Sequence, residues 1–223
     1  MAHSDELIKS TIVDQLYLDI RVDASQISVA VEDGVATLRG EVPTYHSSRS
    51  AYRDALQVGG VKSVMNQLVV RYPAGAVLPT DAALLSAVKE TLARNPDISI
   101  EDMDIEVDGG RIILRGSVDA YWKKPYAEEL ISGEPGVLGI TNHLTVVPGS
   151  DVVDRDIAAA IVRSLEGRAA VSADDVEVRV EGGRVVLEGA VFGWAAVQAA
   201  QEAAEYTEGV IDIANKLTVD KRE

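Results

Sequence analysis

The sequence predicts an α+β fold made of three tandem αββαβ units, each with two helices packed on one face of a three-stranded sheet. Three observations support this prediction. A Gly-x-Val/Ile-x-Leu-x-Gly segment occurs three times, with Ala36 at the Val/Ile position of the first copy, and a Gly-Val ending that leads into Asn-x-Leu follows each copy. Apolar residues at helical spacing precede each copy. The Gly-x-Val/Ile segments are residues 34–40, 110–116 and 183–189, and the endings are residues 60–68, 136–144 and 209–217.

The period of this repeat sets the domain organisation. Successive copies are offset by 76 and 73 residues, which is longer than the 20–50 residues of a solenoid repeat. Each unit is therefore predicted to be a complete small domain, with boundaries at residues 1–72, 79–148 and 151–220. Domains of this size bury little surface, so we expect contacts between units to add stability.

A first helix is predicted at the start of each unit. Apolar residues recur at spacings of three and four, the pattern of an amphipathic helix. An aspartate opens each helix, where it complements the helix dipole, and Thr80 is the predicted N-cap of the second of these helices. The apolar positions are Ile8, Ile12 and Leu16, then Leu84, Val88 and Leu92, then Ile157, Ile161 and Leu165; the acids are Asp5, Asp81 and Asp154.

A hairpin is predicted next. Apolar and polar residues alternate, as in a half-buried strand. The alternation ends at Asp33-Gly34, Gly109-Gly110 or Gly182-Gly183, pairs that favour a type I′ turn because both central residues need positive φ. The other repeated glycines are also interpreted as turn geometry.

A second helix and a last strand complete each unit. The helix begins near Tyr45, Tyr121 or Trp194, and we expect it to end in a left-handed turn at a glycine. The repeated asparagine in the last strand suits a turn or bulge. The glycines are Gly60, Gly136 and Gly209; the strands are residues 61–70, 137–147 and 210–219; the asparagines are Asn66, Asn142 and Asn215.

These two motifs, three times in one register, resemble the BON domain of bacterial osmotically induced and nodulation proteins. The resemblance covers nearly the whole chain and implies the same αββαβ fold. It also implies binding to phospholipid or support of the cell envelope, often under osmotic stress. Potassium binding is associated with part of the family, and many members are periplasmic. The family supplies no catalytic residues.

Charge and composition exclude several classes of function. The chain has no cysteine, so disulfides, thiolate zinc sites and a cysteine nucleophile are excluded. The net charge of −15 argues against nucleic-acid binding, which draws on clustered Lys and Arg. The longest apolar runs are far shorter than the ~20 residues of a transmembrane helix. With no signal-peptide pattern at the N-terminus, the expected location is cytoplasmic, or periplasmic if the natural chain is longer.

The residues give no sign of catalysis. The three histidines occupy unrelated positions, and no nucleophile-elbow motif accompanies them. No Lys-Ser/Thr follows the repeated glycines, so they are not phosphate-binding loops. We therefore predict a protein that is not an enzyme and that uses no cofactor or resident metal.

The most unusual local segment combines aromatic side chains and lysines in the second unit. Such a mixture favours a membrane interface or a partner protein, although each lysine near an anionic surface contributes only about 1 kcal/mol. Tyr121 aligns with Tyr45 and Trp194 and is interpreted as a structural aromatic. The predicted contact residues are Tyr121, Trp122, Lys123, Lys124 and Tyr126.

A weaker candidate is an acidic strand in the same unit. Its carboxylates alternate, so they share one solvent-facing side, and hard cations bind carboxylate oxygen. The spacing fails the EF-hand pattern, because Val107 stands at the loop's sixth position and Ile113 at its twelfth. A solvated acidic face that discourages strand pairing is the alternative. The residues are Asp102, Asp104, Glu106 and Asp108.

Three functional hypotheses remain open from the sequence. The first is a stress-associated module that docks on an anionic phospholipid surface through Trp122, Lys123 and Lys124. The second is a scaffold that binds a protein partner or its own copies as a homo-oligomer, favoured by the Ala-rich stretch at residues 194–204. The third is sensing of K⁺ or Ca²⁺ through the acidic strand.

Overall fold

The computed structural model describes residues 5–220, so residues 1–4 of the predicted first domain lie outside the described residues. The predicted fold is confirmed: helices and strands follow the αββαβ order three times. Unit 1 comprises α1 (Asp5–Leu18), β1 (Ile27–Glu32), β2 (Val35–Val42), α2 (Tyr45–Gln57) and β3 (Ser63–Val70).

Units 2 and 3 repeat this order with one difference. The last strand of unit 2 is split into two short strands. Unit 2 comprises α3 (Asp81–Arg94), β4 (Met103–Asp108), β5 (Arg111–Val118), α4 (Lys123–Ile131), β6 (Gly139–Asn142) and β7 (Thr145–Val146). Unit 3 comprises α5 (Asp154–Glu166), β8 (Val176–Glu181), β9 (Arg184–Phe192), α6 (Trp194–Glu205) and β10 (Asp212–Asp220). Single 3₁₀ turns, η1 (Ala24–Gln26) and η2 (Ala173–Asp175), precede β1 and β8.

Each sheet has the same topology. The two hairpin strands pair antiparallel, and the last strand pairs parallel to the second one, which is therefore central. In unit 1, Leu38 on the central strand lies opposite Val29 on one side and Asn66 on the other. Leu38 is fully buried, and so are its equivalents Leu114 and Leu187. The repeated leucine thus forms the middle of each core.

The hairpin turns confirm the predicted geometry and show a second role for the opening aspartates. Both central residues of the first turn have positive φ, 51° for Asp33 and 79° for Gly34. The carboxylate of Asp5 accepts hydrogen bonds from both of their backbone amides, at 2.9 and 3.1 Å. Asp81 and Asp154 bind their own turns in the same way. These acids therefore join the first helix to the hairpin, in addition to complementing the helix dipole.

One repeated glycine is required by close packing inside a strand, where the sequence suggested a turn. Gly40 lies within β2 with φ 129°. A Cβ on it would lie 1.9 Å from the carbonyl oxygen of Gln26, a clash with rigid backbone. Gly116 and Gly189 meet the equivalent carbonyls at 1.9 and 2.1 Å. A side chain at these positions would separate the 3₁₀ turn or its equivalent from the sheet.

The glycines after the second helices are a correction to the sequence analysis. We expected Gly60, Gly136 and Gly209 to terminate those helices, but the helices end earlier, at Gln57, Ile131 and Glu205. All three glycines do have positive φ, between 84° and 97°. Their carbonyl oxygens pack against the hairpin-turn glycines, where a Cβ would lie only 2.5–2.9 Å away. They allow the loop to pass close to the hairpin.

The repeated asparagine ties the edge strand to the second helix. In unit 2 the side chain of Asn142 donates to the carbonyl of Lys124 on α4 and accepts from the amide of Leu144. The pairing offset is 28 residues on both sides of it, from Leu114 and Asn142 in β6 to Ser117 and Thr145 in β7. Asn66 and Asn215 likewise lie inside unbroken strands of constant offset. The turn or bulge predicted at this asparagine is therefore wrong, because its side chain joins a regular edge strand to the helix.

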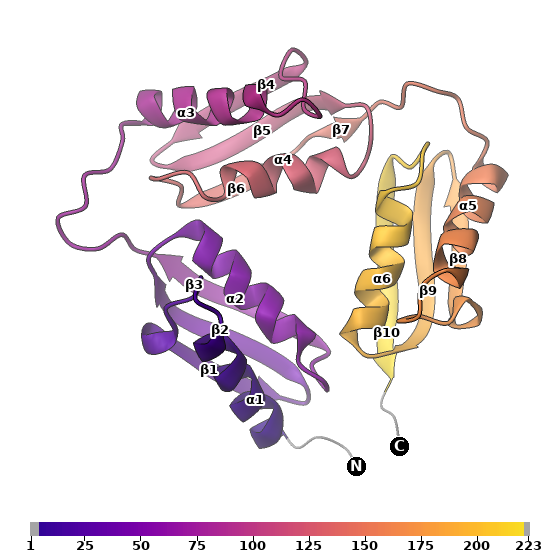
Figure 1. Ribbon diagram of the computed structural model, residues 1–223, viewed down its shortest axis with the longest axis horizontal. Helices are drawn as coiled ribbons and strands as arrows, with labels where there is room; N and C mark the ends of the chain where they lie inside the picture. The colour runs from indigo at the N-terminus through magenta and orange to yellow at the C-terminus, as the bar shows by residue number, and fades with distance from the viewer. Residues whose placement is uncertain (1–4, 221–223) are drawn as a thin grey trace.

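The three units lie around a common centre, with the second helices α2, α4 and α6 toward the middle and the first helices toward the periphery (Figure 1). Contacts join α2 to α6, so units 1 and 3 meet as well. None of the helices in residues 5–220 has the length and apolarity that a membrane span needs.

Candidate functional site

Repeated and unrepeated residues have different uses in this structure. The repeated Asp, Gly and Asn residues are all engaged in holding a unit together. The unrepeated residues include the aromatic and lysine segment of unit 2, which the structure places at the joint between units 2 and 3. This joint is our main candidate site.

Tyr121 crosses the joint. Its ring packs against the hydrophobic core of unit 3. Burial raises the pKa of its hydroxyl, and the nearby carboxylates of Glu205 and Asp212 add to that increase. A tyrosine that contacts a neighbouring unit agrees with the structural part we assigned to this residue.

Trp122 belongs to a cluster of three rings drawn from two units. Its ring centroid lies 5.5 Å from that of Tyr126 and 6.1 Å from that of Tyr206, which it faces at 24°. Both distances are in the range of favourable aromatic pairs. Tyr206 follows α6 and is 68% exposed, so the cluster reaches the surface.

Tyr206 was missed by the sequence analysis. It lies 80 residues from Tyr126, in another unit, and no local motif links the two. One signal was available: the aligned positions in units 1 and 2 are Gln57 and Gly133, so the tyrosine is not required by the fold.

The lysines are close to the rings but already have partners. The ammonium of Lys123 lies 5.7 Å from the centre of the Trp122 ring and 2.8 Å from the carboxylate of Asp119. That of Lys124 lies 5.5 Å from the centre of the Tyr121 ring. Both are cation–π distances. The structure thus brings all five predicted contact residues together, with one positive charge neutralised in place.

The joint between units 1 and 2 uses equivalent positions with different chemistry. Tyr45, the counterpart of Tyr121, packs on the core of unit 2, and its hydroxyl donates to Glu128. Arg49 forms ion pairs with Glu128 at 2.5 Å and Glu129 at 3.4 Å, and Arg53 pairs with Glu129. This joint is held chiefly by ion pairs between α2 and α4.

Tyr72, in the linker between units 1 and 2, adds two hydrogen bonds to the same joint. Its hydroxyl accepts from the amide of Gly136 at 2.7 Å and donates to the carbonyl of Val137.

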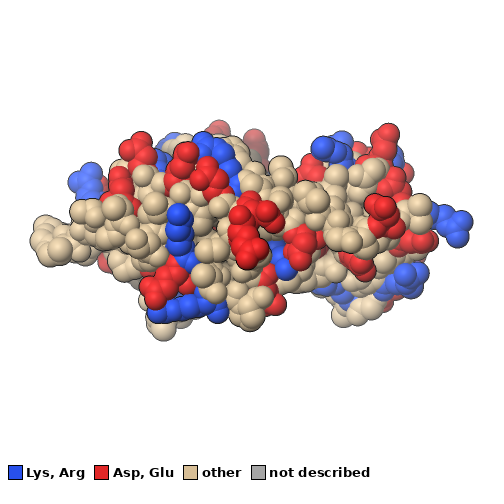
Figure 2. Space-filling view, turned by 90° about the horizontal axis from the view of Figure 1, so that it is seen from above, with Lys and Arg blue, Asp and Glu red and all other residues tan. Residues whose placement is uncertain are grey.

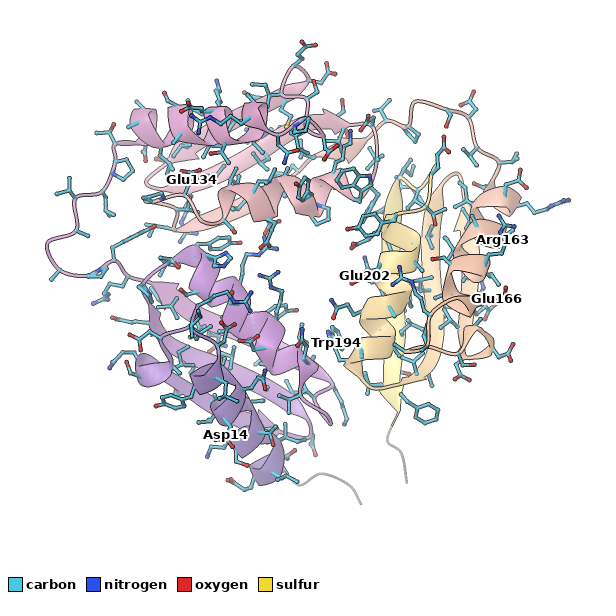
Figure 3. The ribbon with its side chains drawn as sticks, viewed as in Figure 1. Asp14, Glu134, Arg163, Glu166, Trp194 and Glu202 are labelled. Carbon is cyan, nitrogen blue, oxygen red and sulfur yellow. The ribbon has the colours of Figure 1, made fainter. Side chains whose placement is uncertain are left out.

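On the opposite side of the molecule, Trp194 and Glu202 project from α6 toward the middle, whereas Arg163 and Glu166 lie on the outer helix, α5 (Figure 3).

Asp104, Glu106 and Asp108 lie on β4 and are exposed, as predicted, whereas Asp102 is exposed but lies in the turn before the strand. Glu106 forms an ion pair with Arg115 on the neighbouring strand. Within residues 5–220, no group of three or more His, Asp or Glu side chains is placed to hold a metal ion. Cation binding by this strand stays a prediction.

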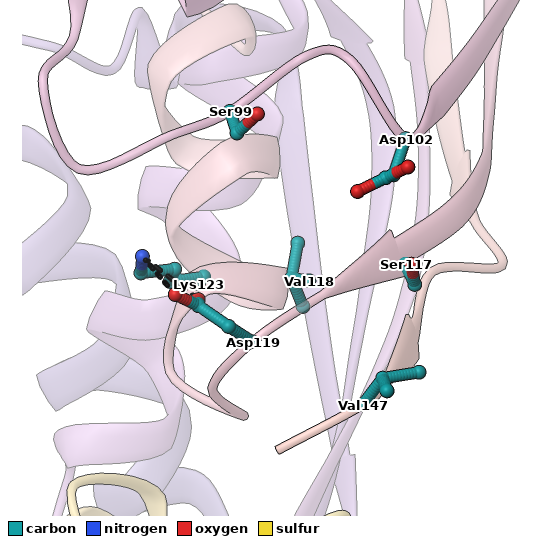
Figure 4. Close-up of a pocket in the computed structure, with 7 residues that line it drawn as sticks. All are labelled: Ser99, Asp102, Ser117, Val118, Asp119, Lys123 and Val147. Carbon is teal, nitrogen blue, oxygen red and sulfur yellow. Dashed lines mark hydrogen bonds and ion pairs between the residues drawn. The ribbon is translucent and has the colours of Figure 1, made fainter. Parts of the chain in front are cut away.

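A hollow of about 250 Å³ lies on unit 2 between the α3–β4 loop, the end of β5 and the start of α4. Figure 4 shows Asp102 on one side of it and the pair of Asp119 and Lys123 on the other. The hollow thus brings together one residue from each of the two sets that the sequence singled out. Its other lining residues are Ser99, Ser117, Val118 and Val147.

A buried carboxyl lies on α2 in unit 1. Asp54 is 6% exposed, and one of its oxygens has no hydrogen-bond partner. Burial, with the adjacent Asp19, raises its pKa to about 6. A hydrogen bond from Arg21 lowers the pKa of Asp19 well below its usual range, although burial opposes this. The pair acts within the fold, where it anchors the α1–β1 loop.

The surface charges are mixed. On the face shown in Figure 2, basic side chains stand among acidic and apolar ones and form no continuous basic area. Unit 1 carries 7 basic and 9 acidic side chains over residues 1–72, whereas residues 150–223 carry 8 and 15. This distribution gives no track for a nucleic-acid backbone.

Comparisons with known proteins agree with the repeat. The chain is 29% identical to osmotically-inducible protein Y of Escherichia coli (strain K12) over 140 residues, which is 61% of this chain and 68% of that protein. Two solved structures of CdsD, a structural protein of the Type III secretion system of Chlamydia trachomatis, align over 96% of this chain at 15% identity, with TM-scores of 0.27 and 0.25.

The comparisons give no support to the cytoplasmic location expected from the sequence, and we do not retain it. The BON domain family matches three stretches, residues 4–72, 80–148 and 153–221, which together span almost the whole chain. The protein therefore belongs to the BON domain family, as a chain of three tandem BON domains.

Proposed function

We propose that this protein is a non-enzymatic module of the osmotic-stress response that docks on an anionic phospholipid surface of the cell envelope. The stress assignment rests on its likeness to osmotically-inducible protein Y. The docking assignment rests on one observation, the cluster of Trp122, Tyr126 and Tyr206 with Lys123 and Lys124 beside it.

The chemistry of this cluster suits a membrane interface. Trp and Tyr rings lie at the headgroup level of bilayers, with an apolar body and a polar edge. Lysines beside them add electrostatic attraction to anionic lipid, about 1 kcal/mol each. Because Lys123 is paired with Asp119, we assign most of that attraction to Lys124 and most of the apolar contact to Trp122 and Tyr206.

Flotation of the full chain with vesicles tests this proposal. We expect flotation with anionic vesicles that weakens with salt, and little flotation with neutral ones. The double variant Trp122→Ala, Lys123→Glu should lose it. The matched control is Tyr17→Ala, Lys9→Glu on α1, which makes the same changes in charge and ring count at a site where Tyr17 is 67% exposed. Flotation that is equal for both double variants would refute the assignment.

Trp122 also packs within the joint, so its loss could act by opening the molecule. The single variant Lys124→Glu separates the two effects, because it leaves the contacts of Trp122 with its neighbouring rings in place. It should weaken flotation at low salt while lowering the melting temperature far less than Trp122→Ala does, because it removes only the contact of Lys124 with the Tyr121 ring. A loss of flotation that appears only together with a lower melting temperature would count against direct docking.

A scaffold role is the second candidate, favoured by the joints. Each joint places an aromatic residue from the start of one second helix on the core of the next unit. Surfaces that dock head to tail within one chain can also do so between chains. Light scattering over a range of concentrations tests this: an increase in mass with concentration supports it, and a constant monomer mass refutes self-assembly.

A further inference from the structure

We propose that the hollow on unit 2 is a binding site for a small amino polyol, a molecule with one ammonium group and several hydroxyl groups. This inference goes beyond the proposed function and does not depend on it. It rests on the charge, the free polar groups and the size of the hollow, and on its restriction to unit 2.

The first argument is the unpaired carboxylate of Asp102. No hydrogen bond or ion pair to that carboxylate is found among residues 5–220, although its backbone carbonyl accepts from the amide of Ser117. In Figure 4 the carboxylate points into the space beside Ser99 and Val118. A carboxylate in this position is suited to a primary ammonium group, which would donate a charge-assisted hydrogen bond.

The second argument is the pair on the opposite side. Lys123 donates and Asp119 accepts, and their atoms lie 2.8–3.1 Å apart. A ligand hydroxyl can accept from the first and donate to the second at once, whereas a ligand carboxylate would be repelled by Asp119. The hydroxyls of Ser99 and Ser117 also line the hollow and offer further hydrogen bonds of the same kind.

Charge and size agree with this class of ligand. Two aspartates and one lysine give the lining a net charge of −1, which complements a ligand of charge +1. Pockets for drug-sized ligands measure about 300–1,000 Å³, so a hollow of about 250 Å³ suits a smaller molecule. An amino sugar of six carbons has the required groups.

The fold does not require this set of residues. At the positions of Asp119 and Lys123, unit 1 has Pro43 and Ser47, and unit 3 has Phe192 and Ala196. Asp175 of unit 3 occupies the position of Asp102 but has no such pair opposite it. Unit 3 therefore offers a matched control for the acid.

The test is a titration of the full chain with D-glucosamine, in which binding is monitored by the chemical shifts of backbone amides in NMR spectra. It is done in phosphate buffer, because Tris is itself an amino polyol, and at a pH where the amine is protonated. D-glucose, which lacks the ammonium group, and cyclohexylamine, which lacks the hydroxyls, serve as comparison probes. We expect saturable shifts around Ser99, Asp102 and Lys123 with glucosamine, and much weaker binding of the other two.

Variants place the site. Asp102→Asn should weaken glucosamine binding about tenfold or more, the effect of losing a hydrogen bond to a charged group, whereas Asp175→Asn should bind as wild type does. Both should melt as wild type does, and Asp102→Asn should float with vesicles normally, which separates this site from the docking patch. Absence of saturable shifts, equal binding of all three probes, or unchanged affinity in Asp102→Asn would overturn the proposal.

Discussion

Both joints seat a tyrosine from the start of one second helix on the core of the next unit, but the joint between units 1 and 2 adds ion pairs and the joint between units 2 and 3 adds a cluster of rings. Arg49 and Arg53 meet Glu128 and Glu129 at the first. At the second, Trp122 lies on Tyr206, and Tyr121 enters the core of unit 3.

Aligned residues make the difference plain. His46 in unit 1 is bonded to Ser132 of unit 2, and its counterpart Trp122 reaches Tyr206, one residue beyond the counterpart of Ser132. The geometry of docking is thus retained while its chemistry is exchanged. Repeated residues determine how each unit folds, and unrepeated residues determine what each second helix contacts.

The largest effect is expected from the aromatic joint. Tyr121→Ala should destabilise the docking of unit 3 by about 2 kcal/mol, roughly half the cost for a fully buried ring. Calorimetry should then resolve a separate, earlier transition for unit 3. Tyr17→Ala, at an exposed tyrosine of unit 1, should leave the thermogram within about 0.5 kcal/mol of wild type. A single unshifted transition in Tyr121→Ala would show that the ring does not couple the units.

A charge reversal at the ionic joint should have a smaller effect on stability than the loss of Tyr121 has at the aromatic joint. Glu128→Arg removes the partner of Arg49 and places like charges together, at an expected cost of about 1–2 kcal/mol for a half-buried pair. Adding Arg49→Glu should restore part of that loss, because the pair is then reversed. Denaturant unfolding of both variants gives the coupling, and the absence of any rescue would contradict direct pairing.

A smaller, pH-dependent effect is expected near the ionic joint, at Asp54. Its pKa is raised from 3.8 to about 6, so the folded state holds the proton more tightly, and stability falls as the pH rises from about 4 to 6. Asp19, whose pKa is lowered, acts in the opposite sense, and its contribution is lost below about pH 4.

Asp54→Asn should therefore raise stability at pH 7 by about 1 kcal/mol and remove the decline between pH 4 and 6. Urea unfolding at several pH values measures both. A variant that keeps the decline would assign it to another group.

Local chemistry explains which parts of the fold were predictable. The type I′ turn can be predicted from Asp33 and Gly34 alone, because the turn needs positive φ at its two central residues and an Asp-Gly pair adopts that conformation readily. The turn contact of Asp5 was not predictable in the same way, because the two amides it binds are 28 and 29 residues away. The helix ends were misplaced because Gly60 has the expected backbone conformation but serves close packing against Gly34.

The candidate sites show the same division. The segment from Tyr121 to Tyr126 stood out by composition, yet Tyr206 joins it only when two units dock. Likewise, Asp102 and Lys123 belonged to separate predicted sets, and the topology of unit 2 brings them to one hollow. Contacts between distant parts of the chain depend on how helices, strands and units pack, and the spacing of apolar residues in the sequence does not indicate that packing.

The most direct test of the contrast between the joints is a pair of distance measurements as salt is raised. Because the chain has no cysteine, spin labels can be placed across each joint in otherwise unchanged protein. Salt at 1 M reduces the Debye length to about 3 Å, so the distance distribution across units 1 and 2 should broaden and that across units 2 and 3 should stay narrow. Equal broadening at both joints, or broadening at the aromatic joint alone, would contradict the account.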